Sequence, residues 1–136
     1  MKRSKILVVD DYTDNREMYA EYLVHKGYEV VEATNGSEAI ERAFEHAPDL
    51  VVMDLSLPGV DGWEATRRLK ADERTRRIPV VVVTGHARAE DARNARAAGC
   101  DAFLAKPCLP EDLYRKITEM LGAGARPKAK APVGKK

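Results

Sequence analysis

The chain has 136 residues, of which 44% are hydrophobic and 33% charged, so it is long enough for one domain with a packed core. Its 23 basic and 22 acidic residues nearly cancel, but residues 122–136 hold five of the basic and none of the acidic ones, which leaves the preceding part with a net charge of −4. No apolar run approaches the roughly 20 residues of a membrane helix, and the N-terminus lacks a signal-peptide core, so we expect a cytoplasmic protein without membrane contact. Two cysteines, Cys100 and Cys108, are too few for a disulfide framework, and we expect both to be reduced.

Short apolar runs rich in β-branched residues alternate with amphipathic segments. In chain order we expect a strand at residues 6–9, a helix at 13–26, a strand at 28–33, a helix with its apolar stripe at 39–47, a strand at 50–53, a helix at 62–71, a strand at 79–84, a helix at 89–98, a strand at 101–105 and a helix at 110–121. Thr13 is the expected N-cap of the first helix, and Asn35-Gly36 is expected to form a turn after the second strand.

This alternation of five strands with five helices predicts a parallel α/β sheet. Crossover helices on both faces of such a sheet account for strands that are apolar along their whole length. Residues 122–136 have no periodicity and are rich in Ala, Gly, Pro and Lys, so we expect a basic, disordered tail. Its five cations, without an aromatic residue to stack on bases, predict no more than weak attraction to nucleic acid.

Polar residues stand where the strands end. They are Asp10 and Asp11 after the first strand, Asp54 after the third, Thr84 at the end of the fourth and Lys106 after the fifth. In a sheet of order 2-1-3-4-5 the three carboxylates meet at the switch point of the strand order. Carboxylates so close repel one another unless a cation neutralises them, and a small cluster of hard oxygens suits Mg²⁺. Lys106 and Thr84 are then expected to face a bound anion.

Each of these residues also has a plainer interpretation. An Asp-Asp pair at a strand end is usually a helix cap or a solvated loop, Thr84 alone is a β-branched strand residue, and Lys106 alone is a surface cation. Their joint placement favours a site.

Together these motifs resemble the receiver domain of two-component response regulators. The resemblance rests on Asp10-Asp11, on Asp54 within the segment VMDLSLPGVDG (residues 52–62), on Thr84-Gly85 and on Lys106-Pro107. It covers about residues 5–121. It implies a flavodoxin-like (βα)5 three-layer sandwich with a five-stranded parallel sheet in the order 2-1-3-4-5, with a receiver domain at residues 1–121 and the tail at 122–136.

The resemblance implies a role for each site residue. Asp54 is expected to be the phosphoacceptor. Asp10, Asp11, Asp54 and the backbone carbonyl of Ser56 are expected to hold Mg²⁺, for which Mn²⁺ is an alternative. Lys106 is expected to pair with a phosphoryl oxygen and to precede a cis peptide bond to Pro107.

Two further pairs of residues follow from the same resemblance. Thr84 and Phe103 are expected to switch position on phosphorylation, although the family often has tyrosine where this chain has Phe103. Ser56 and His86 each lie two residues after a site residue, and we hypothesise that they modulate the lifetime of the phosphoaspartate.

The expected function is a phosphorylation-activated signalling switch in a two-component phosphorelay. The phosphodonor is a sensor histidine kinase or a phosphotransfer protein, and the output is a contact with a downstream protein through the fourth helix, fifth strand and fifth helix. We expect no enzyme activity beyond Mg²⁺-dependent self-phosphorylation and autodephosphorylation, and no direct binding of nucleic acid.

Two other hypotheses remain. The chain is alternatively the receiver portion of a longer DNA-binding response regulator or a hybrid kinase, with residues 122–136 as a linker. A phosphohydrolase on the same fold is disfavoured, because a haloacid-dehalogenase-like enzyme needs a second acid where this chain has Ser56.

Overall fold

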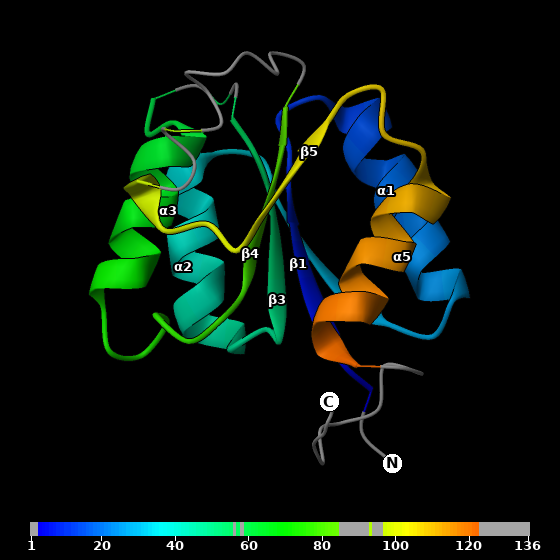
Figure 1. The fold of residues 1–136 in the computed structure, drawn as a ribbon, viewed down its shortest axis with the longest axis horizontal. Helices are drawn as coiled ribbons and strands as arrows, with labels where there is room; N and C mark the ends of the chain where they lie inside the picture. Colours follow the sequence, from blue (N-terminus) through cyan, green and yellow to red (C-terminus); the bar gives the residue numbers. More distant parts are fainter. Residues whose placement is uncertain (1–2, 56, 58, 85–92, 94–96, 123–136) are drawn as a thin grey trace.

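The computed structural model of the chain describes residues 3–55, 57, 59–84, 93 and 97–122 (Figure 1). In chain order the elements are β1 (Lys5–Val9), α1 (Thr13–His25), β2 (Glu29–Ala33), α2 (Gly36–His46), β3 (Leu50–Asp54), α3 (Gly62–Ala71), β4 (Val80–Thr84), β5 (Ala102–Ala105) and α5 (Pro110–Leu121). All nine lie within one or two residues of the expected positions, apart from the start of α2.

The five strands form one parallel sheet in the order β2-β1-β3-β4-β5. This order confirms the expected flavodoxin-like architecture. The strand order reverses between β1 and β3, which are neighbours although α1, β2 and α2 lie between them in the chain. The carboxyl ends of these two strands are therefore the place at which a ligand site is expected.

Helices cover both faces of the sheet, with α1 and α5 on one face and α2 and α3 on the other (Figure 1). Alternate residues of each central strand enter different cores: Leu7 and Val9 of β1 pack with Ala39 and Ala65, while Ile6 and Val8 pack on the side of α1 and α5. Since side chains of a strand alternate between faces, burial of both faces explains why these strands are apolar at every position.

Three local expectations are wrong. The N-cap of α1 is Tyr12, which has no side-chain cap, and Thr13 is the first helical residue; the chain turns one residue early because the Tyr12 amide donates to Asp10 Oδ1 at 2.9 Å. Asn35 and Gly36 do not form a separate turn, because Asn35 is the N-cap of α2 and Gly36 is already helical.

The third concerns Phe44, expected in the buried stripe of α2. It is 39% exposed, and the guanidinium of Arg74 lies 4.0 Å from its ring centroid. The ring therefore makes a cation–π contact with a loop residue at the surface of α2 instead of packing in the core.

Some expectations fall outside the described residues. Of the helix expected at 89–98, the structure describes only Arg93, Ala97 and Ala98, which are helical, and residues 123–136 are also outside. Cys100 and Cys108 are both present as thiols, as expected, and not as disulfides. Among the described residues, no helix has the length and apolar character needed to cross a membrane.

Candidate functional site

The carboxyl ends of β1 and β3 bring three aspartates together. Val9 of β1 is paired with Met53 of β3, so the residues that follow them, Asp10 and Asp54, lie level with each other. One carboxylate oxygen from each of Asp10, Asp11 and Asp54 lies within 4.8 Å of the others. Asp10 and Asp54 are buried, whereas Asp11 is exposed at the rim. Three convergent oxygen donors with one open side are a donor set that fits a hard divalent cation.

Lys106 adds a positive charge to this cluster. Its Nζ lies 3.6 Å from Asp54 Oδ1 and 3.9 Å from Asp10 Oδ2, and a quarter of its side chain is exposed. The backbone amide of Lys106 donates to the carbonyl of Thr84 at 2.7 Å, which ties the ends of β4 and β5 together. The peptide bond between Lys106 and Pro107 is cis, as expected.

Thr84 completes the rim as the last residue of β4, next to β3 in the sheet, and it is fully buried. Phe103 lies on β5 opposite Val82, half-buried against the core on the side of α2 and α3. Ser56 and His86 lie outside the described residues.

Electrostatics at the site follow from burial and crowding. Burial raises the pKa of the Asp10 carboxyl above its usual range, and the neighbouring Asp54 raises it further. The Tyr12 amide and the ammonium of Lys106 lower it, without reversing the direction. One lysine therefore does not fully compensate three carboxylates, and the site favours an additional cation.

Other residues hold the site in shape, and the sequence analysis did not identify them. Arg16 donates to the carbonyl of Asp10 at 3.1 Å and is paired with Glu32. The hydroxyl of Tyr19 donates to the carbonyl of Cys108 at 2.7 Å and so connects α1 to the loop that follows Lys106. No local pattern marks either contact, because the partners lie 6 and 89 residues away in the chain.

Gly62 is a third such residue. A Cβ at this position meets the carbonyl oxygen of Asp54 and the Cα of Leu55. The start of α3 therefore packs directly on the backbone of Asp54. The only sequence signal is the pair Asp61-Gly62 at a helix start, where Asp61 caps the amide of Glu64.

Comparisons with known proteins agree with this geometry. The family model of the response regulator receiver domain matches residues 6–118. The polar-differentiation response regulator DivK of Brucella anthropi is 38% identical over 117 residues, which are 86% of this chain and 95% of DivK.

Two solved structures are also similar. The chemotaxis protein CheY4 of Vibrio cholerae has a TM-score of 0.83 and 28% identity, covering 87% of this chain and 98% of CheY4. The receiver domain of the sensor histidine kinase PA1611 of Pseudomonas aeruginosa, which has a magnesium ion coordinated in its active site cleft, has a TM-score of 0.82 and 33% identity, covering 90% of this chain and all of that one. The strand order, the residues at the strand ends and these similarities lead to one conclusion: the chain belongs to the response regulator receiver domain family of two-component signalling.

Proposed function

We propose that this chain is a switch that accepts a phosphoryl group on Asp54 from a phosphohistidine of a sensor histidine kinase or phosphotransfer protein. An oxygen of the Asp54 carboxylate attacks phosphorus, the phosphorus–nitrogen bond breaks, and the imidazole leaves with its electron pair. The observation that carries the proposal is the convergence of Asp54 with Asp10, Asp11 and Lys106 at the switch point of the sheet.

Residues around Asp54 suit a reaction that asks for positioning and charge neutralisation. Asp10, Asp11 and Asp54, with the backbone carbonyl of Ser56, would hold Mg²⁺ or Mn²⁺. The divalent ion neutralises negative charge on the transferred group when it is bound. The magnesium ion in the PA1611 receiver domain supports this assignment.

Lys106 is the second source of positive charge. With its Nζ 3.6 Å from Asp54 Oδ1, it is within reach of an oxygen attached to that carboxylate. On phosphorylation, the ammonium of Lys106 would turn from the Asp54 carboxylate to a phosphoryl oxygen. The phosphoryl group carries more negative charge than the carboxylate and attracts the ammonium more strongly.

Thr84 and Phe103 would report the modification to the surface. Thr84 ends the strand next to Asp54 and offers a hydroxyl to a phosphoryl oxygen, and Phe103 lies on the neighbouring strand β5. The hydroxyl-free ring of Phe103 would be held inward by burial alone. The surface that changes would include β5 and α5, and a downstream protein would bind there. Ser56 and His86 are proposed to tune the lifetime of the modified state.

The test is incubation with Mg²⁺ and a small phosphodonor such as acetyl phosphate, followed by intact-mass measurement. We expect one added phosphate that survives acid and is lost in base, that needs the divalent cation, and that is absent from Asp54→Asn. Asp72→Asn is the matched control, because Asp72 follows α3 and, among the described residues, its carboxylate forms an ion pair with Arg74 alone. A label that persists in Asp54→Asn contradicts the proposal.

A further inference from the structure

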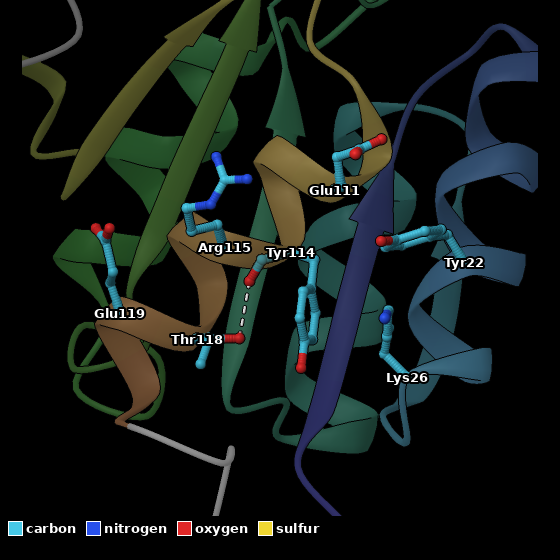
Figure 2. A pocket seen from close by; sticks show the side chains of 7 residues that line it. All are labelled: Tyr22, Lys26, Glu111, Tyr114, Arg115, Thr118 and Glu119. Atoms are coloured by element: carbon cyan, nitrogen blue, oxygen red, sulfur yellow. Dashed lines mark hydrogen bonds between the residues drawn. The ribbon is translucent and has the colours of Figure 1, made fainter.

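A groove runs between α1 and α5, away from the aspartate cluster. Its volume is about 490 Å³, and Figure 2 shows Tyr22 and Lys26 on one wall and the side chains of α5 on the other. Tyr22 and Tyr114 meet edge to face across it, with ring centroids 6.2 Å apart. Both rings are half-buried, so the groove has an aromatic floor within reach of solvent.

The groove continues into a strongly acidic hollow near the start of α5. Asp14, Glu17 and Glu21 line that hollow together with Tyr22, which borders both. Glu111 lies in the first turn of α5 and lines the groove itself. These four carboxylates are exposed, and none forms an ion pair with any other residue in the described part of the chain.

Positive charge lies at the opposite end of the groove. The Nζ of Lys26 lies 5.5 and 5.3 Å from the ring centroids of Tyr22 and Tyr114. Arg115 and Lys116 are already paired, with Asp112 and Glu119 respectively, each at 3.2 Å. The groove is therefore acidic toward the N-terminal end of α5 and basic toward its C-terminal end, so an occupant must present its cations at the acidic end.

Residues 123–136 of this chain have that order of charges. The first residues after α5 are uncharged, and Arg126, Lys128, Lys130, Lys135 and Lys136 follow with no acid among them. The helix α5 has 12 residues and is about 18 Å long. Six residues of extended chain after Gly122 span about 19 Å, so a segment that turns back along α5 brings Lys128 level with Glu111.

Proline adds a second match. Pro127 directly precedes Lys128, and extended proline-containing segments dock onto grooves lined by aromatic residues at low entropic cost. In this alignment a proline lies next to the lysine that reaches Glu111, close to the aromatic side chains of the groove.

We propose that residues 123–136 fold back along α5 and dock in the groove between α1 and α5, with their lysines facing Glu17, Glu21 and Glu111. The contact is intramolecular and needs little intrinsic affinity, because a short tether gives an effective concentration on the order of millimolar. It covers a face built from α1 and α5 and does not depend on phosphorylation of Asp54.

The test compares amide NMR spectra of the full chain with those of the full-chain variant Lys128→Gln/Lys130→Gln. We expect shift changes confined to α1 and α5 around Glu21, Tyr22 and Tyr114. They should shrink at least twofold between about 0.1 M and 1 M NaCl, because the screening length falls from about 10 Å to about 3 Å. Arg76→Gln/Arg77→Gln is the matched control, since it removes the same charge from exposed positions after α3 and should leave these amides unchanged.

Zero-length carbodiimide cross-linking of the unmodified full chain gives an independent readout. Cross-links from Lys128 or Lys130 to Glu17, Glu21 or Glu111 within the monomer support the proposal. Cross-links found only in dimers, with shifts that vanish on dilution, would assign the groove to a second copy and overturn it. Shift changes that are absent, that scatter over α2 and α3, or that appear equally in the arginine control also overturn it.

Discussion

Asp10 shows how a residue of the proposed metal site affects the stability of the fold. It is almost fully buried beside Asp54, and burial together with that neighbour raises its pKa. A raised carboxyl pKa means that the charged form is disfavoured in the folded state relative to the unfolded one. The ionised site therefore lowers the stability of the metal-free fold, and we expect a divalent cation at the proposed site to reverse that effect.

The variant Asp10→Asn tests how the charge of Asp10 affects stability with and without a divalent cation. Without divalent cation we expect it to be more stable than the parent, because it removes a poorly solvated charge and keeps an oxygen for the Tyr12 amide. Its stabilisation by Mg²⁺ should be much smaller. Thermal unfolding with and without Mg²⁺ measures both effects, with exposed Glu41→Gln as the control. A lower melting temperature without metal would contradict the expectation.

At the scale of single elements, α2 begins with a reciprocal pair of caps. Asn35 Oδ1 accepts from the Glu38 amide at 2.8 Å, and Glu38 Oε1 accepts from the amide and the hydroxyl of Thr34, each at 2.8 Å. The two bonds from Thr34 lower the pKa of the Glu38 carboxyl. Because Thr34 directly follows β2, these bonds connect the end of β2 to the first turn of α2.

Removal of the cap should weaken the fold measurably. We expect Asn35→Ala to lower the free energy of unfolding by about 1 kcal/mol, since the Glu38 amide loses its partner. Ser37→Ala, at an exposed position of the same turn, should change it by a few tenths at most. Urea denaturation at neutral pH distinguishes the two, and equal midpoints for both variants would count against the cap.

The start of α3 requires a residue without a side chain at position 62. Gly62 packs against the backbone of Asp54 and Leu55, which cannot yield as a flexible side chain can. We expect Gly62→Ala to destabilise the fold by about 2–3 kcal/mol and to reduce phosphorylation, because it displaces the backbone of Asp54. Gly59 has a φ of 68°, and no atom lies within 4 Å of a Cβ added there. Gly59→Ala should therefore lose only about 1 kcal/mol of stability, from backbone strain alone. Equal losses for the two variants would refute the packing argument.

At the scale of the whole molecule, contacts between distant segments hold the rim of the site together. The bond from Tyr19 to the carbonyl of Cys108 joins α1 to the loop between β5 and α5. The hydroxyl of Tyr28 lies 3.4 Å from Thr118 Oγ1. The face of the sheet covered by α1 and α5 is thus connected across 89 and 90 residues of sequence.

The Tyr19 contact predicts a pH dependence. Burial raises the pKa of the Tyr19 hydroxyl to about 12. Because its pKa is higher in the folded than in the unfolded state, the neutral hydroxyl stabilises the fold fully below about pH 10. This stabilisation, on the order of 2–3 kcal/mol, is lost as the pH rises to about 12. Tyr19→Phe should lack this part of the alkaline destabilisation, whereas Tyr12→Phe, at a 59% exposed position, should retain it. Unfolding measured from pH 9 to 12 gives the comparison.

Much of this organisation is readable in the sequence. The sheet is predicted by the apolar runs at β1, β3 and β4. The rim of the site is predicted by the aspartates, threonine and lysine at the strand ends. Each prediction depends on a pattern only a few residues long. The strand order followed from the family resemblance. Periodicity is a local property, so it indicates which elements form.

Tertiary structure alone decided how those elements meet. The capping of α1 by Tyr12 involves the carboxylate of Asp10, and the exposed ring of Phe44 is in contact with Arg74. Glycine is needed at position 62 because of the backbone at the end of β3. The groove between α1 and α5 likewise requires side chains of two helices about 90 residues apart. Each of these features is a contact between segments that are distant in sequence, and such a contact is set by packing geometry, which no short stretch of residues contains.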